Sequence, residues 1–293
     1  MQSSIAIRDY PCGSGKTTSM IEGFQSDRKY LVIVPLLSEV ERVIQGAKSF
    51  HFQQPHANDN EAGTKTESLK AMVLQGHNIA ATHSLHERLV PIARDGLLSD
   101  YDIIIDEVPE VVRSVTSKSK TSIEEFYLNR GFMCVDPLTE HVTRTQKWWS
   151  LRDDVDDTLS TKILGYANTG CLYLLGGRLF VWAMPKELLT AGRSTTIMTY
   201  KSEGSVLSAY LKKPGVPFEV ANDNLMEVSF RAKARELMTI KDRLSLSYSG
   251  QVVGVSNASY SSTVENALKI LRGCQLKDVP AENILITCAK DGW

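Results

Sequence analysis

The 293-residue chain has little that would mark a secreted, membrane-bound or metal-binding protein. It has only five cysteines, and no two form a Cys-x-x-Cys pair, which argues against a disulfide framework and a zinc site. No apolar run approaches the roughly 20 residues that a membrane span needs. The N-terminus also lacks the basic start and apolar core of a signal peptide. We therefore expect a cytoplasmic protein without a membrane partner.

The chain also lacks an excess of charge of either sign, since its formal net charge is −1 at pH 7. A nucleic-acid-binding protein often has a basic excess, so any such surface here must be local. Residues 231–243 are rich in lysine and arginine, but a run of this kind is more typical of a solvated helix face. The chain length suits one large domain or two ordinary ones.

Residues 10–18 read Tyr-Pro-Cys-Gly-Ser-Gly-Lys-Thr-Thr and are the most informative run in the sequence. They match the end of a phosphate-binding loop, and they lie between a strand-like stretch with Ile5 and Ile7 and a helical pattern. Backbone N–H groups of such a loop can surround an anion. The residues expected to bind nucleotide phosphates are Pro11, Cys12, Gly13, Ser14, Gly15, Lys16, Thr17 and Thr18.

Two residues of this loop have specific expected roles. Lys16 would place its ammonium group on the β- and γ-phosphates of ATP, and Thr17 would offer its hydroxyl to Mg²⁺. The usual pattern opens with a glycine where this chain has Tyr10. A chance glycine turn is the alternative interpretation, and a second motif argues against it.

That second motif is the run 101–107, Tyr-Asp-Ile-Ile-Ile-Asp-Glu, in which three successive isoleucines precede Asp106 and Glu107. Such a run predicts a central parallel strand buried on both faces, and catalytic groups collect at the carboxyl ends of these strands. Asp106 would hold Mg²⁺ through water, and Glu107 would act as the general base on the attacking water. An acidic turn after a strand is the alternative, but the pairing with Lys16 favours catalysis.

Hydrophobic patterns predict the elements around these motifs. Two apolar runs flank Gly176-Gly177 and predict a hairpin, whereas residues 108–130 look helical in part. The other predicted strands are 30–35, 78–83 and 195–200, and the predicted helices are 37–47, 66–76 and one that begins near Ser205.

The form Pro-x-Gly-x-Gly-Lys-Thr, together with the Asp-Glu pair, resembles superfamily 2 helicases and translocases. The resemblance implies an α/β fold with a three-layer, parallel-sheet, RecA-like domain over residues 1–215. It also implies ATP and Mg²⁺ as cofactors and single- or double-stranded nucleic acid, preferentially DNA, as partner. Three residues are similar to family positions beside the nucleic acid: Thr82, His83 and Thr199.

The segment after Thr199 further resembles phage-type helicases, because Glu203-Gly204-Ser205 stands where they have a similar turn. A viral protein would then act in the cytoplasm of a host cell. Residues 216–293 restart the pattern, with strand-like stretches at 251–256 and 284–289. We expect a partial second RecA-like lobe there, without the late arginine motif. The chain would then be a fragment of a longer protein, or its second lobe would be degenerate.

Two other functions fit the same motifs. A viral DNA-packaging ATPase of the terminase type shares a degenerate phosphate loop and an Asp-Glu pair, although such motors usually have a nuclease domain. A helicase-derived module that binds ATP without hydrolysing it would also retain the phosphate loop. Stimulation of hydrolysis by single strands would separate a helicase from the non-hydrolysing module, and dependence on a capsid portal would identify the packaging motor.

Overall fold

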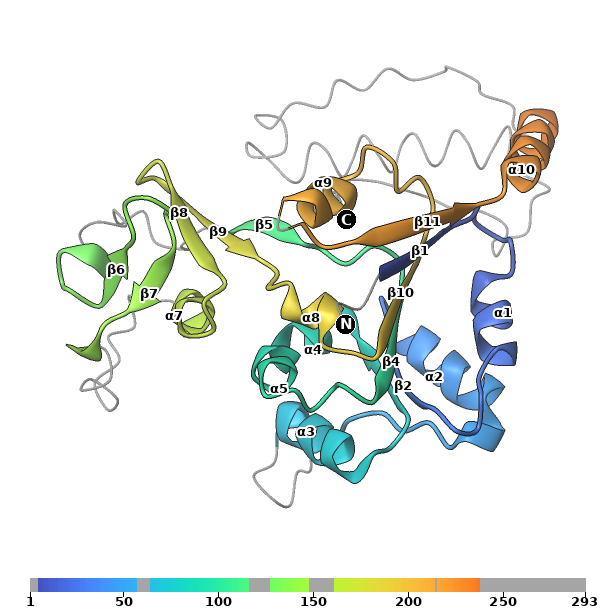
Figure 1. The fold of residues 1–293 in the computed structure, drawn as a ribbon, viewed down its shortest axis with the longest axis horizontal. Coiled ribbons are helices and arrows are strands. Elements are labelled where there is room, and N and C mark those ends of the chain that lie inside the picture. The colour runs from blue at the N-terminus through green and yellow to red at the C-terminus, as the bar shows by residue number, and fades with distance from the viewer. Residues whose placement is uncertain (1–4, 57–63, 116–126, 148–160, 214, 238–293) are drawn as a thin grey trace, which may run out of the picture. The chain divides into compact units, whose positions relative to one another are not determined.

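The computed structural model describes residues 5–56, 64–115, 127–147, 161–213 and 215–237. The chain divides into two compact units, Met1–Ala234 and Arg235–Trp293. Almost all of the second unit lies outside the described residues, and with it the strands predicted at 251–256 and 284–289. The fold described below is therefore that of the first unit (Figure 1).

A six-stranded parallel sheet forms the centre of this unit, with the strand order β11-β1-β10-β4-β2-β3. The phosphate loop follows β1, and the acidic pair lies at the carboxyl end of β4, with β10 between the two strands. The strands are β1 (Ile5–Asp9), β2 (Lys29–Val34), β3 (Ile79–Thr82), β4 (Tyr101–Asp106), β10 (Ser194–Thr199) and β11 (Phe218–Asn222).

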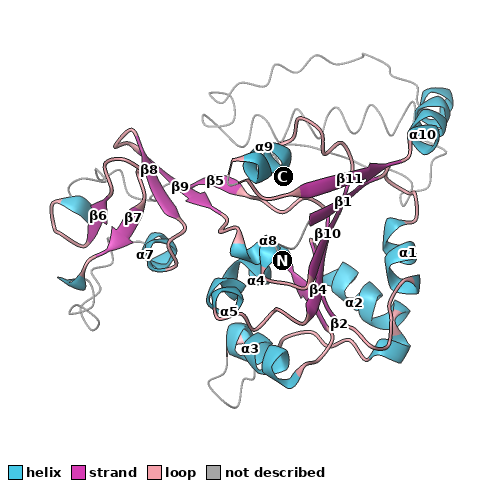
Figure 2. Cartoon of the chain, in the orientation of Figure 1, coloured by secondary structure: helices cyan, strands magenta, loops and turns pink. Residues whose placement is uncertain are grey.

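Helices cover both faces of this sheet, because its central strands are apolar on both sides (Figures 1 and 2). The side chains of α1 (Lys16–Glu22) and α2 (Leu37–Gly46) pack on one face. The opposite face packs against α3 (Lys65–Gln75), α4 (His83–His86), α5 (Val90–Arg94), α8 (Glu187–Thr190) and α9 (Val206–Lys212). Two short 3₁₀ helices are η1 (Lys48–Phe50) and η2 (Glu87–Leu89). The predicted α/β, RecA-like, three-layer class is confirmed.

An insertion between β4 and β10 has its own small core, which includes Tyr127, Ile163 and Phe180. Its elements are β5 (Val112–Val115), β6 (Met133–Val135), β7 (Val142–Arg144), α7 (Thr161–Asn168), β8 (Leu172–Leu175) and β9 (Leu179–Ala183). The predicted hairpin at Gly176-Gly177 is confirmed, and both glycines have positive φ angles.

Only some of the residues 108–130, predicted to be helical in part, belong to the described part of the chain. The partly helical pattern expected over 108–130 contains the strand β5, which pairs antiparallel with β9. Valines at both ends of β5 suit a pleated strand, and the partner strand lies more than 60 residues further along the chain. A local pattern cannot reveal that partner.

The end of the first unit lies later than the predicted boundary at residue 215. Strand β11 pairs in parallel with β1 and so belongs to the main sheet. Helix α10 (Asn224–Leu237) follows it, and the compact unit extends to Ala234. A second lobe within 216–293 stays a prediction, because residues 238–293 lie outside the described part.

Candidate functional site

The phosphate loop connects β1 to α1 and depends on two glycines. Gly13 and Gly15 have φ angles of +74° and +80°, which side-chain-bearing residues rarely adopt. The loop folds back on itself around Lys16, whose Nζ donates to the carbonyl oxygen of Tyr10 at 2.8 Å. The ammonium also lies 3.4 Å from the carbonyl of Pro11. The hydrogen-bond partners of Lys16 are therefore uncharged carbonyl oxygens, which a phosphate group could replace.

The hydroxyl of Thr17 and the carboxylate of Asp106 meet at this loop. Thr17 Oγ1 donates to Asp106 Oδ2 at 3.1 Å, although the two residues are 89 positions apart. Asp106 is only 7% exposed, so its carboxylate is held at the carboxyl end of β4. The structure thus brings together the two residues that the sequence predicts as Mg²⁺ ligands.

The peptide bond between Asp106 and Glu107 is held from two sides. Its carbonyl oxygen lies 2.8 Å from Nε2 of His83, and its N–H donates to the carbonyl of Met198 at 2.9 Å. Glu107 itself has a φ of +64°, an uncommon angle for a residue with a side chain. Such strain is kept only where neighbours hold the backbone. These contacts therefore determine the direction in which the exposed Glu107 side chain leaves the strand.

A cavity of about 430 Å³ lies over these groups. Its size is within the range of small-molecule sites. Its lining comes from the phosphate loop, the end of β4 and the start of α2. The lining residues are Cys12, Gly13, Ser14, Gly15, Lys16, Thr17, Pro35, Leu36, Glu39, Arg42, Asp106 and Glu107. Of the predicted nucleotide-site residues, Pro11 and Thr18 do not line it.

These donors suit Mg²⁺ chemically. The ion prefers oxygen ligands and is usually held by one or two protein groups together with phosphate oxygens and water. Thr17 and Asp106 offer two such oxygens 3.1 Å apart. Among the described residues, no group of three His, Cys, Asp or Glu side chains is arranged to hold a metal by itself. Phosphate and water would therefore have to complete the coordination.

The three residues predicted to contact nucleic acid lie at the same end of the sheet. Thr82 shares a hydrogen bond with Ser84, with 3.1 Å between their hydroxyl oxygens. His83 contacts the Asp106 carbonyl, as described above. Thr199 is only 2% exposed, and its carbonyl accepts a hydrogen bond from the N–H of Tyr10. Thr199 therefore connects β10 with the phosphate loop, and its contact with nucleic acid stays a prediction.

Sequence reasoning missed an acid directly before the phosphate loop. The carboxylate of Asp9 accepts hydrogen bonds at 2.7 Å from the N–H groups of Lys201 and Ser202 and from the Ser202 hydroxyl. Burial alone would raise the pKa of Asp9, but these hydrogen bonds outweigh it and lower the pKa. Asp9 thereby ties the start of the loop to the turn that follows β10.

Sequence reasoning also missed Glu39 and Arg42. Both lie on α2 and line the cavity, and Arg42 Nη1 donates to Glu39 Oε2 at 2.9 Å. The local signal was the i,i+3 spacing of opposite charges on the helix that follows the second strand. That spacing alone does not distinguish an ordinary surface pair from residues of a binding site.

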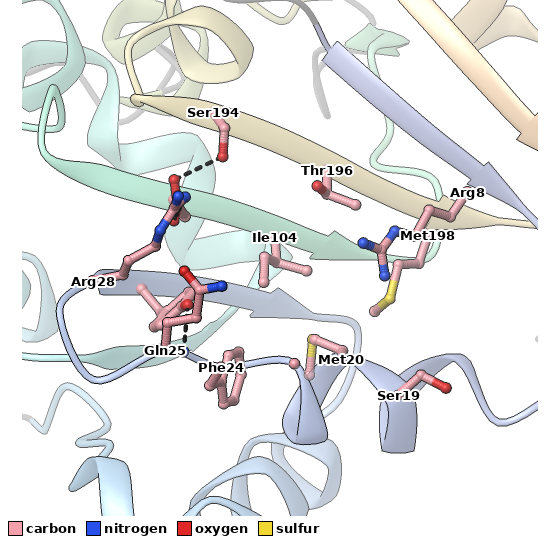
Figure 3. A pocket seen from close by; sticks show the side chains of 13 residues that line it. Arg8, Ser19, Met20, Phe24, Gln25, Arg28, Ile104, Ser194, Thr196 and Met198 are labelled. Carbon is pink, nitrogen blue, oxygen red and sulfur yellow. Dashed lines mark hydrogen bonds and ion pairs between the residues drawn. The ribbon is translucent and has the colours of Figure 1, made fainter.

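A second cavity, of about 200 Å³, runs along one face of the sheet from Asp102 to Met198. Figure 3 shows Arg28 and Ser194 at one end of this cavity, away from Arg8 and Ser19. Asp102 accepts hydrogen bonds from Arg193, Ser194 and Arg28 at 2.7–3.0 Å. Burial would raise its pKa, but these hydrogen bonds and the charge of Arg193 lower it. The carboxylate is fully paired, which indicates a structural role.

Comparison with known proteins gives only distant similarities. No protein-family model and no curated protein matches the chain. An apo XPD structure is 16% identical, with a TM-score of 0.42, and the match covers 93% of this chain and 64% of that one. S. tokodaii Xpd4 is 16% identical, with a TM-score of 0.38, and the match covers 76% of this chain and 57% of that one. The Pyrococcus furiosus Hef helicase domain is 13% identical, with a TM-score of 0.32, and the match covers 96% of this chain and 48% of that one.

This chain therefore spans less than two thirds of the length of each of these structures. At these identities and TM-scores the similarity assigns no activity, substrate or partner to the chain. None of the three supports the phage-type expectation. In the described part of the chain, no helix has the length and apolar character needed to cross a membrane.

Proposed function

We propose that this chain is an ATP hydrolase of the superfamily 2 helicase type, which couples hydrolysis to movement on nucleic acid. One observation carries the proposal. Thr17 and Asp106 meet at 3.1 Å in a cavity that the phosphate loop and Glu107 also line. A loop lysine, a hydroxyl, a carboxylate for the metal and a second carboxylate for water are the groups that phosphoryl transfer to water requires.

Each of these groups has a defined task in the proposed reaction. Lys16 exchanges its hydrogen bond to the Tyr10 carbonyl for one to a phosphate oxygen, and backbone N–H groups of the loop bind the remaining phosphate oxygens. Glu107 orients the attacking water and accepts its proton. Thr17 and Asp106 would hold Mg²⁺, which neutralises charge on the transferring phosphoryl group when it is bound with ATP.

Nucleic acid is the proposed partner, with DNA as the preferred form. Support comes from the position of Thr82 and His83 beside the acidic pair, since His83 contacts the carbonyl of Asp106. If His83 contacts both the bound nucleic acid and the peptide bond between Asp106 and Glu107, it would connect nucleic-acid binding with ATP hydrolysis. The hydrogen bond from Tyr10 to the carbonyl of Thr199 provides a second connection, through β10.

The decisive experiment measures ATP hydrolysis by the full chain and by Lys16→Ala, with and without single- and double-stranded DNA and RNA. We expect slow hydrolysis that nucleic acid stimulates, and loss of that activity in Lys16→Ala, because the variant lacks the loop cation. Activity of Lys16→Ala equal to that of the wild type would contradict the proposed site.

The same assay separates the alternatives. ATP binding without hydrolysis, whether or not nucleic acid is present, would indicate a non-hydrolysing module. Hydrolysis that depends on a capsid portal instead of free nucleic acid would indicate a packaging motor. We expect little unwinding by this chain alone, because an arginine from a second lobe contributes about 10³–10⁵ in rate in related enzymes. Residues 235–293, which follow the first compact unit and lie in the part predicted to begin such a lobe, show no late arginine motif.

A further inference from the structure

The nucleotide cavity contains a second basic side chain besides that of Lys16. Arg42 projects from α2 and lines the same cavity as the phosphate loop and the acidic pair. Among the described lining residues, Lys16 and Arg42 are the basic ones, and they stand against the carboxylates of Glu39, Asp106 and Glu107. ATP brings several further negative charges to this cavity, so the position of Arg42 matters.

The packing of α1 against α2 shows where along the loop Arg42 lies. A Cβ atom added at Gly46 would come within 2.9 Å of Ile21 Cδ1, so the two helices touch at this level. Both helices begin at the carboxyl ends of parallel strands and run back along the same face of the sheet. Moving one turn toward their starts leads from Gly46 to Arg42 and from Ile21 to Thr17, because residues four apart share a helix face. Arg42 therefore lies at the level of the proposed metal ligand.

The ion pair between Arg42 and Glu39 is weak. Its side chain is 53% exposed, and its ion pair is formed with Glu39, one turn away on the same helix. Exposed pairs of this kind contribute little to stability, because water screens them. A phosphate group is a stronger partner, since the planar guanidinium can donate two parallel hydrogen bonds to its oxygens. The pair can thus open when an anion enters the cavity.

We propose that Arg42 binds the terminal phosphate of the nucleoside triphosphate and thereby distinguishes the triphosphate from the diphosphate. This inference rests on the proposed function and adds a phosphate-binding residue from α2. In the absence of nucleotide, Glu39 holds the guanidinium at the cavity wall. With the triphosphate bound, Arg42 adds a second positive charge beside that of Lys16, without a residue from another protein.

The experiment compares equilibrium binding of ADP and of a non-hydrolysable ATP analogue, each with Mg²⁺, to the wild type and to Arg42→Ala. We expect the variant to lose about tenfold or more in affinity for the triphosphate analogue, the loss of one charged hydrogen-bonded contact. Its affinity for ADP should stay within about twofold of the wild type. Arg42→Lys should recover only part of the loss, because an ammonium lacks the guanidinium fork.

Arg231→Ala is the matched control. Arg231 also pairs with a glutamate on its own helix, Glu227, and the side-chain exposures of 56% and 27% are close to the 53% and 29% of Arg42 and Glu39. We expect this variant to bind both nucleotides like the wild type. Glu39→Gln, which releases Arg42 from its ion pair, should keep or increase affinity for the triphosphate analogue.

Two results would overturn the inference. Unchanged affinities for both nucleotides in Arg42→Ala would show that Arg42 does not bind the terminal phosphate. Equal loss of both affinities would show a general effect on the cavity. Either result leaves the proposed function intact if the wild type binds ATP and Lys16→Ala does not. A wild type that binds neither nucleotide would contradict both the proposed function and the inference.

Discussion

His83 Nε2 lies 2.8 Å from the carbonyl oxygen of Asp106 and reaches it across the end of β2. The imidazole therefore holds the peptide bond that precedes Glu107, whose N–H is held from the other side by Met198. A histidine that the sequence suggests as a nucleic-acid contact thus also has a place in the geometry of the proposed general base.

Replacing His83 with alanine should slow ATP hydrolysis while leaving affinity for ATP·Mg²⁺ near that of the wild type. The reason is that the phosphate loop stays intact but Glu107 loses its fixed direction. Misplacement of a catalytic group by about 1 Å costs on the order of a hundredfold in rate, so we expect a loss of roughly tenfold to a hundredfold. The measurement is steady-state turnover without nucleic acid, together with nucleotide binding.

Two variants serve as comparisons for His83→Ala. His83→Gln keeps a side-chain donor and should retain more turnover, whereas His56→Ala changes an exposed histidine outside the site and should have no effect. Normal turnover of His83→Ala combined with weaker binding of single-stranded DNA would instead make His83 a nucleic-acid contact alone.

Glu107→Gln should separate binding from chemistry. The variant keeps the size of the side chain and most of its hydrogen bonds but removes the base, so ATP·Mg²⁺ should still bind. Turnover should fall by about 10²–10⁴-fold, the range for general-base catalysis. Measured loss of ATP affinity, with turnover per bound nucleotide unchanged, would mean that Glu107 has a structural role only.

His86 should make stability depend on pH between about 5 and 7. It is 1% exposed, and burial lowers its pKa to about 4, with a backbone hydrogen bond to Leu188 opposing the shift and the nearby His83 adding to it. The unfolded chain binds the proton more readily, so this stability is fully present above the unfolded pKa of about 6.5 and is lost as pH falls toward 4. We expect the free energy of unfolding to drop by about 2 kcal/mol from pH 7 to pH 5.

Chemical denaturation of wild type and His86→Gln at several pH values tests this expectation. The difference between the two proteins should shrink as pH falls from 7 to 5, because glutamine does not titrate. A difference that is constant over this range would contradict the assignment of the pH dependence to His86.

Asp102→Asn should lower stability without changing nucleotide binding. Asp102 joins β4 to Arg28 and Arg193 at the end of the strand away from the phosphate loop. Both arginines are 41% exposed and can be solvated when the charge is removed, so we expect a modest loss of about 1–2 kcal/mol in the free energy of unfolding. Asp100→Asn is the control, because Asp100 is 76% exposed and lies 3.5 Å from Lys29. Equal effects of the two substitutions would contradict the role of Asp102.

The sequence by itself determined the parts of the site that depend on neighbouring residues. Gly13 and Gly15 mark the phosphate loop because few other residues adopt their φ angles. The three successive isoleucines before Asp106 mark a buried parallel strand, because both faces of such a strand meet protein. The hairpin at Gly176-Gly177 could also be predicted from the sequence, because the two turn residues lie directly between the strands that pair.

Only the tertiary structure decided which distant residues meet. The order of strands places β10 between β1 and β4, and this order brings Thr17 to Asp106 and Met198 to Glu107. Pairing with β9 makes 112–115 a strand, and the packing of α2 beside the phosphate loop places Arg42 in the cavity over that loop. Hydrophobic periodicity reports how each segment is buried. It does not report which segment lies next to which, because that choice depends on packing among all the strands and helices at once.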